Sequence, residues 1–249
     1  MIKPVVHTQL KNGIQLITVP HKDATSVTIM VFVKVGSRYE TKELNGASHF
    51  IEHMMFKGTK KRPTSLDISR ELDRFGAEYN AYTAKDVTAY YIKIDAEKQK
   101  LAIDLLNDML FHSKFEAEEV ARERGVIIEE IHMYQDNPAS HMEDLLEEAL
   151  FPNSTLGWAI VGPKENIKTI PREGLVGYRD AYYIPSRMTI AVSGNLRTDF
   201  KALLEKTFGS VRQPKETRDA PFTPFVMTPN HPEWLKFQYK KTEQVQLGM

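Results

Sequence analysis

The stretch Ser26–Phe56, SVTIMVFVKVGSRYETKELNGASHFIEHMMF, passes from one expected secondary structure to another. Its first part, SVTIMVFVKVGS, is rich in β-branched residues and follows a similar segment, IQLITVPH (14–21), after the polar KDAT. These two segments predict two antiparallel strands. Residues 45–56 carry apolar side chains at helical spacing, which predicts a helix after the strand pair.

The order of the remaining segments indicates the fold class. A second helix is expected to begin at Thr64, with Asp67 three residues on, and to end at Gly76. The segments that follow lack the regular alternation of strand and helix that a doubly wound fold shows. We therefore expect an α+β fold, with helices packed on one face of a mostly antiparallel sheet. The further expected elements are strands 77–83, 87–95 and 187–195 and helices 97–111, 116–134, 137–150, 173–182 and 198–208.

The distribution of proline divides the chain near its C-terminal end. Residues 213–232 contain five prolines, which is typical of a linker. We therefore expect one α+β domain over residues 1–212. The segment 233–249 has the composition of a strand, and a strand is not stable alone. It either pairs with the main sheet or belongs to a part that this sequence does not include.

Composition limits the classes of ligand and partner. The 33 Lys and Arg residues balance the 33 Asp and Glu residues, so no global field attracts nucleic acid or an anionic membrane. The basic run from Lys57 to Arg62 is interpreted as a solvated exit from the first helix. No segment has the length of a membrane span and no leader is visible, so we expect a cytoplasmic protein without nucleic-acid or membrane partners. Because cysteine is absent, any metal must bind histidine and carboxylate ligands.

Three residues of the first helix are suited to metal chemistry. His49 and His53 are four residues apart, so on a helix both rings project from one face. Two imidazoles so arranged can bind one ion at about 2.0–2.1 Å, and Glu52 beside them can hold a water. The spacing H-x-x-E-H is the inverzincin motif, the reverse of the H-E-x-x-H signature of zinc peptidases. The alternative is a helix with two ordinary histidines.

A catalytic zinc ion requires a third protein ligand, and a later helix offers three glutamates. Glu123 and Glu130 are seven residues apart with Ile127 between them, so they share a stripe that faces the core. Glu129 is rotated away by about 100° and is expected to be more exposed. Two buried carboxylates require a compensating cation, which is either a metal or an Arg or His partner.

Four motifs in order extend this pattern over most of the chain. They are HFIEHMMFKGTKKR (49–62), GAEYNAYTAKD (76–86), RERGVIIEEI (122–131) and LGWAIVGP (156–163). In these motifs the chain, from about Leu10 to Gly209, resembles the pitrilysin/insulinase family of zinc peptidases. Within that family it is most similar to mitochondrial processing peptidase β subunits and their bacterial homologues. The resemblance implies a zinc metalloendopeptidase that hydrolyses extended peptides and binds one Zn²⁺ per chain.

The resemblance also implies a role for each residue of the metal motifs. His49, His53 and Glu130 correspond to the zinc ligands of the family. Glu52 corresponds to the general base that activates water. Glu123 corresponds to a second acidic residue, which supports the catalytic site without being a principal ligand.

Three further positions correspond to substrate-binding residues of the family. Asn80 and Ala81 match an edge strand whose backbone pairs with substrate, and such a strand binds extended peptides through main-chain hydrogen bonds. Asparagine is disfavoured in strands, so a polar role for Asn80 is expected. Phe56 matches an aromatic residue of a pocket just beyond the scissile bond, and a plain core position is the alternative.

Members of the family carry a second, similar half that closes over the zinc site, in the same chain or as a partner. The resemblance covers the N-terminal half, so a second half-chain or a homo- or hetero-oligomer is expected to complete the chamber. Segment 233–249 resembles the first strand of that second half. Two alternatives remain, a non-catalytic peptide-binding or structural module of the same fold and a metal-dependent hydrolase of another substrate class.

Overall fold

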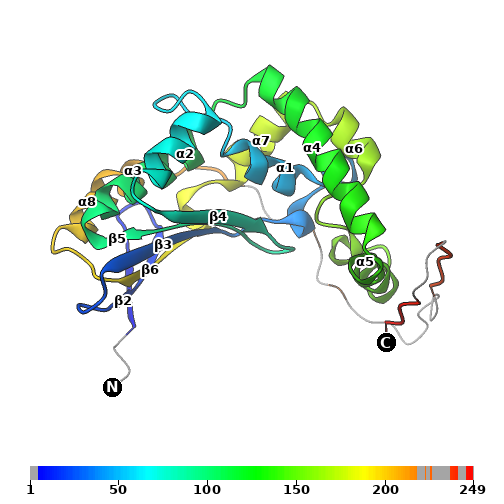
Figure 1. Cartoon of the computed structure of the whole chain (residues 1–249), viewed down its shortest axis with the longest axis horizontal. Coiled ribbons are helices and arrows are strands. Elements are labelled where there is room, and N and C mark those ends of the chain that lie inside the picture. The colour runs from blue at the N-terminus through cyan, green and yellow to red at the C-terminus, as the bar shows by residue number, and fades with distance from the viewer. Residues whose placement is uncertain (1–4, 218–221, 223–224, 226–235, 241–244, 249) are drawn as a thin grey trace.

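A single sheet lies at the centre of the computed structural model, which describes residues 5–217, 222, 225, 236–240 and 245–248. Within these residues the sheet has six strands in the order β1-β2-β6-β3-β5-β4 (Figure 1). Neighbouring strands are antiparallel except β2 and β6, which are parallel. The strands are β1 (Val6–Gln9), β2 (Gln15–Pro20), β3 (Ser26–Val33), β4 (Glu78–Thr83), β5 (Thr88–Asp95) and β6 (Met188–Gly194).

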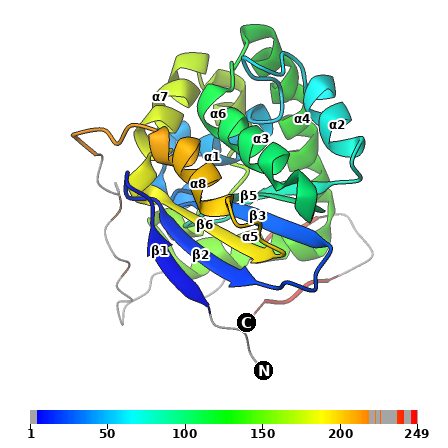
Figure 2. The same cartoon turned by 90° about the vertical axis from the view of Figure 1, so that its left-hand side faces the viewer.

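Helices cover one face of this sheet. They are α1 (Ala47–Met54), α2 (Ser65–Asp73), α3 (Gln99–His112), α4 (Ala117–Asp136), α5 (Pro138–Leu150), α6 (Lys164–Thr169), α7 (Arg172–Tyr182) and α8 (Phe200–Lys206). Figures 1 and 2 show α1, α2, α3, α7 and α8 on the same side of the sheet, while α4, α5 and α6 gather at the end away from β2. The arrangement confirms the expected α+β fold with a mostly antiparallel sheet.

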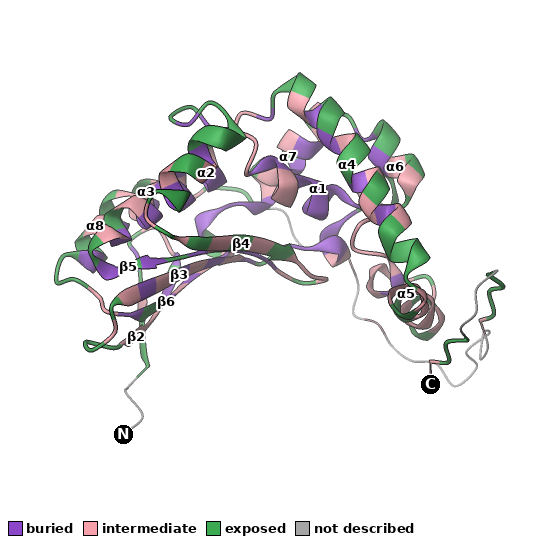
Figure 3. Ribbon diagram, viewed as in Figure 1, coloured by how far each residue is buried: buried purple, intermediate pink, exposed green. Residues whose placement is uncertain are grey.

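The core lies between the sheet and these helices. In β3, Val27, Ile29, Val31 and Val33 are fully buried, and the residues between them are half-buried. This period of two is that of a strand with one face against the core. Figure 3 shows the buried residues concentrated where the helices meet the sheet. The alternation in the opening stretch therefore determines which face of the sheet the helices cover.

The two strands predicted at the start of the chain do not pair with each other. They run in opposite directions as expected, but β6 lies between them and is hydrogen-bonded to both. The connection from β2 to β3 crosses the end of β6, where the N–H of His21 donates to the carbonyl of Gly194 at 2.7 Å. Gly194 has a φ of +127°, and a Cβ there would lie 2.3 Å from the carbonyl oxygen of Ser26. Glycine is therefore required at this crossing.

The basic segment after α1 is an anchored turn, and its interpretation as a solvated helix exit is wrong for two of its cations. Arg62 is only 7% exposed, and its guanidinium bonds Glu71 at 2.5 Å, Asp104 at 3.0 Å and Asp108 at 2.9 Å. Lys57 is half-buried and also has a carboxylate partner, whereas Lys60 and Lys61 are exposed. The turn is thus tied to α2 and α3 by buried charge pairs.

The predicted linker and terminal strand fall largely outside the described residues. Of segment 233–249, residues 236–240 and 245–248 are described, and neither part forms a strand in this chain. The side chain of Lys240 contacts Asp136 at 2.9 Å, and Gln238 hydrogen-bonds His141 at 2.8 Å. The division at residue 212 stays a prediction. Across the part of the chain that the structure describes, every helix is too short or too polar to cross a membrane.

Candidate metal centre

Helix α1 brings two histidines to one face, as the motif predicted. Its eight residues include His49 and His53, whose rings lie 4.5 Å apart between centroids. The helix packs against α4, so this face meets the stripe that carries the later glutamates. His49 is 7% exposed and His53 is half-buried. The sequence spacing therefore becomes a pair of imidazoles at a helix–helix interface.

Three ligand atoms converge at this interface. His49 Nε2 and His53 Nε2 lie 3.2 Å apart, and Glu130 Oε2 lies 3.6 Å from the first and 3.4 Å from the second. A tetrahedral ion with bonds of about 2.1 Å separates its ligand atoms by about 3.4 Å. The observed separations match that value. Two imidazoles and one carboxylate are also a ligand set of catalytic zinc sites, which leaves one position for water. The residues therefore fit a zinc ion.

The glutamates of α4 differ in exposure as their helical positions predicted. The side chain of Glu123 is 3% exposed, that of Glu130 22% and that of Glu129 78%. Glu130 is the one that reaches both histidines. Glu123 contacts the outer nitrogen of His53 instead, with Oε1 accepting from Nδ1 at 2.8 Å, and its Oε2 contacts Lys57 Nζ at 2.6 Å. Glu123 thus holds Nδ1 of the His53 ring, while Nε2 of the same ring faces Glu130.

The electrostatics of the group are asymmetric. Burial alone would lower the pKa of His53, but its hydrogen bonds with Glu123 and Glu130 outweigh burial and raise it to about 9. Burial and the neighbouring His53 ring lower the pKa of His49 to about 4. The hydrogen bond from His53 holds the pKa of Glu130 below its usual range. The raised pKa of His53 thus favours its positively charged form beside the carboxylates of Glu123 and Glu130, whereas the lowered pKa of His49 favours the neutral ring.

Glu52 lies on the same helix but is held by a different element. The hydroxyl of Thr83, the last residue of β4, donates to Glu52 Oε2 at 2.5 Å. Burial raises the pKa of Glu52, and the hydrogen bond from Thr83 opposes this rise. The carboxylate is therefore linked to the edge strand by this hydrogen bond. A group so placed can accept and return a proton.

The three predicted substrate-binding residues lie on and near that edge strand. β4 is the last strand of the sheet, so within the described residues one side of it has no partner strand. Asn80 is exposed, and its side-chain oxygen accepts the backbone N–H of Ala81 at 2.9 Å. Phe56 stacks on Tyr79 and lies beside Tyr90, each at 6.4 Å between centroids. Both alternatives for Phe56 remain, because the ring is only partly buried.

Sequence reasoning missed Glu40, whose carboxylate caps α1. Glu40 is 1% exposed and accepts from Asn45 Nδ2 at 2.9 Å and from the backbone N–H groups of Gly46 at 2.8 Å and Ser48 at 2.7 Å. An anion at a helix N-terminus satisfies free N–H groups and the helix dipole. Burial raises the pKa of Glu40 to about 7, against the effect of these donors. In the sequence, the only indication of this role is an acidic residue ahead of the helix, and such residues are common.

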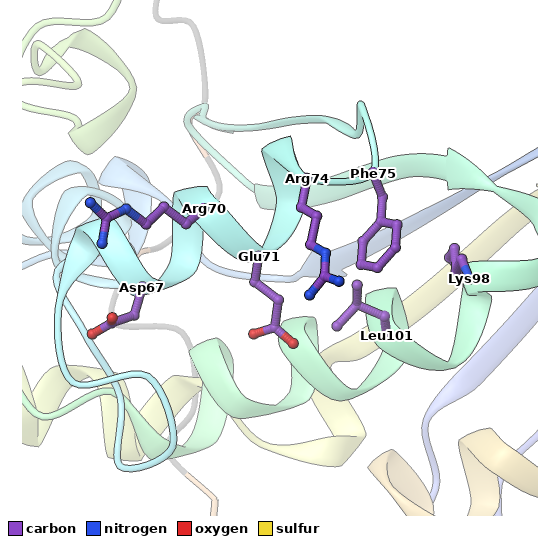
Figure 4. A pocket seen from close by; sticks show the side chains of 7 residues that line it. All are labelled: Asp67, Arg70, Glu71, Arg74, Phe75, Lys98 and Leu101. Atoms are coloured by element: carbon purple, nitrogen blue, oxygen red, sulfur yellow. The ribbon is translucent and has the colours of Figure 1, made fainter.

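Two cavities differ in their relation to the metal group. One of about 570 Å³ lies between α2 and α3, where Arg74 and Lys98 flank the ring of Phe75 at 5.6 and 5.1 Å (Figure 4). Its lining includes none of His49, His53 and Glu130. Another of about 490 Å³ lies between α4, α5 and the loop that follows α5. Tyr134 lines it and helps to lower the pKa of Glu130, so this second cavity borders the group of His49, His53 and Glu130.

Curated proteins and solved structures similar to this chain are named as proteases. The uncharacterised zinc protease YmxG of Bacillus subtilis (strain 168) is 41% identical over 200 residues, 80% of this chain and 49% of that protein. The mitochondrial-processing peptidase subunit beta of Caenorhabditis elegans is 35% identical over 92% of this chain and 49% of that protein. A crystal structure of a protease from Helicobacter pylori superposes with a TM-score of 0.84 at 26% identity, covering 92% of this chain and 55% of that one.

Two family models match along the chain. The model of insulinase, peptidase family M16, matches residues 16–164, and that of the M16 inactive domain matches residues 169–249. The second match includes β6, which is a central strand of the same sheet, so the boundary between the two matches does not divide this structure. The chain spans about half the length of the curated relatives it matches. With the first model matching more than half of its residues, the chain belongs to the insulinase family of peptidases, family M16.

Proposed function

We propose that this chain is the catalytic half of a zinc metalloendopeptidase that hydrolyses extended peptides. The observation that carries the proposal is the convergence of His49, His53 and Glu130 at the spacing of a tetrahedral ion. Membership of the insulinase family and the names of the relatives support peptide hydrolysis. The intact set of metal-motif residues favours a catalytic half over a non-catalytic module.

Each residue of the centre has a separate task in this proposal. His49, His53 and Glu130 hold the ion, and Glu123 orients the His53 ring through Nδ1. Zinc bound to this set would lower the pKa of a water to about 7 and polarise the scissile carbonyl. Glu52 accepts the proton of that water and returns it to the departing amine. The buried position that raises the pKa of Glu52 favours this return.

The edge strand β4 is the proposed substrate strand. An extended peptide can add to its unpaired side by main-chain hydrogen bonds, with alternate side chains entering pockets. Such pairing at Ala81 would displace the Asn80 side chain from the N–H that it occupies. Thr83, at the end of the strand, donates a hydrogen bond to Glu52. A peptide paired with β4 would therefore run toward Glu52, the proposed general base. Phe56 is proposed to line a pocket for a substrate side chain next to the scissile bond.

A second half is proposed to complete the active protein. The chain covers 49% of YmxG and 49% of the processing peptidase subunit, so these relatives contain about as much chain again. We therefore propose that the substrate chamber closes only with a second half-chain or an oligomeric partner. Full peptidase activity then requires this chain to be mixed with that half.

Metal analysis and a peptide-library digest test the proposal together. We expect about one zinc per chain, and cleavage of peptides that increases when the second half is added. Glu52→Gln should keep its zinc and lose turnover, while Glu130→Gln should lose zinc. Glu129→Gln, one residue away and exposed, is the matched control and should behave as the wild type.

Three outcomes would contradict parts of the proposal. Metal-replete protein without bound zinc would refute the metal centre. Zinc binding without peptide cleavage, alone or with the second half, would favour a peptide-binding module. Hydrolysis of non-peptide esters with no hydrolysis of peptides would favour another substrate class.

A further inference from the structure

Both oxygens of the buried Glu123 carboxylate are held by side chains of the α1 segment. His53 Nδ1 lies 2.8 Å from Oε1, and Lys57 Nζ lies 2.6 Å from Oε2. His53 and Lys57 are four residues apart, one helical turn, although α1 itself ends at Met54. The Glu123 carboxylate of α4 therefore has two partners, His53 and Lys57, in the same short segment that carries the H-x-x-E-H motif.

We infer that Lys57 is a positioning residue of the metal centre, which acts through Glu123. A carboxylate held by His53 alone can rotate about its side-chain bonds, and Lys57 removes that freedom by fixing the second oxygen. The fixed carboxylate directs Nδ1 of His53 outward, so that Nε2 faces His49 and Glu130. Partners of this kind, behind a metal-binding histidine, commonly contribute about 10–100-fold to metal affinity.

The same contact sets how α4 lies on α1. Glu123 precedes Glu130 by seven residues, which is two turns or about 10.5 Å along the helix. A charge pair at Glu123 thus fixes the register of α4, and the register brings Glu130 Oε2 to within 3.4–3.6 Å of both imidazoles. Lys57 in this way acts on two of the three ligands without contacting the ion.

The competing explanation is that Lys57 only neutralises a buried carboxylate. In that case its loss would lower the stability of the metal-free protein and leave the geometry of the ligands unchanged. The two explanations predict different zinc affinities for a Lys57 variant. Only the positioning role predicts that the effect of Lys57 on zinc affinity depends on Glu123. Zinc affinity measured by competition with a chromophoric chelator is therefore the informative quantity.

The test compares the folded wild-type chain with Lys57→Met and Lys61→Met. Lys61 is the matched control, because it lies in the same turn and pairs with Asp104 at 2.6 Å, away from the histidines. We expect Lys57→Met to bind zinc about 10-fold more weakly or worse, and Lys57→Arg to recover most of the loss because it can donate to the same oxygen. Lys61→Met should stay within about threefold of the wild type.

A double-mutant cycle shows whether Lys57 acts through Glu123. If it does, adding Lys57→Met to Glu123→Gln will cause no further loss of zinc affinity. Additive losses, or a Lys57→Met variant that binds as tightly as the wild type, would overturn the inference. Circular dichroism of the metal-free variants checks folding, and Lys57→Gln replaces Lys57→Met in the same assay if the latter does not fold. The inference rests on the proposed zinc site, and absence of zinc from the wild type would refute that site instead.

Discussion

Replacing Glu40 by Gln should remove much of the pH dependence of stability between pH 4.5 and about 7. Burial raises the folded pKa of this carboxyl from 4.5 to about 7. A folded pKa above the unfolded one means that the group favours folding when protonated. Its contribution is therefore complete below pH 4.5 and is lost as the pH rises through about 7.

The expected size follows from that interval of pKa. Each pKa unit corresponds to about 1.4 kcal/mol, so the interval from 4.5 to about 7 corresponds to about 3 kcal/mol. No discount for solvent applies, because Glu40 is 1% exposed. The donors Asn45, Gly46 and Ser48 already oppose burial in this balance. About 3 kcal/mol is a large part of the stability of an ordinary domain.

Urea unfolding of metal-free protein at about pH 5 and about pH 8 measures the effect. A chelator in both samples excludes metal linkage, and the other titrating groups cancel when the wild type is compared with Glu40→Gln. The wild type should lose about 2–3 kcal/mol more than the variant on going to the higher pH. Glu118→Gln, at an exposed site in the first turn of α4, should retain the wild-type profile. Parallel profiles for wild type and Glu40→Gln would refute the reasoning, since they would mean that the three donors keep Glu40 ionised throughout.

Three further substitutions test other parts of the structure. Arg62→Met should lower the free energy of unfolding by about 3–5 kcal/mol, because it leaves Asp108, 1% exposed, without its cation; urea unfolding measures this loss. Thr83→Val should lower kcat about tenfold or more with zinc content unchanged, because Glu52 loses the hydrogen bond from the Thr83 hydroxyl. A kcat equal to that of the wild type would contradict the positioning of Glu52 by Thr83. Gly46→Ala should lower the free energy of unfolding by at least about 1–2 kcal/mol, because φ is +100° and the new Cβ would lie 2.7 Å from the Ile167 side chain. A melting temperature equal to that of the wild type would disprove this strain.

The secondary structure could largely be predicted from local pattern, whereas the order of strands could not. The capping box at Thr64 and the alternation in β3 are properties of neighbouring residues, and the structure has both. Pairing of β2 with β6 joins residues about 175 positions apart, and no local signal encodes it. β1 and α6 were also missed, since each is short and weakly patterned.

The shared face of His49 and His53, and that of Glu123 and Glu130, could be predicted because helical periodicity fixes which residues lie on one side of a helix. The i, i+4 spacing of His49 and His53, and the rotation that separates Glu129 from Glu130, both appear in the structure. Glu40, Lys57 and Thr83 could not be predicted, because their partners come from elements whose packing the sequence does not state. Charged residues beside a helix usually face water, and for this reason Lys57 and Arg62 were wrongly expected to be solvated.

The insertion of β6 between β2 and β3 has a consequence for how the chain is made. During synthesis, residues 14–136 emerge with His49, His53 and Glu130, yet β2 and β3 each keep one unpaired edge until residue 194 has left the ribosome. Exposed edges and long-range pairing slow folding and invite association with other chains. A ribosome stalled before β6 should therefore hold a nascent chain that contains His49, His53 and Glu130 and still depends on chaperones to stay unaggregated.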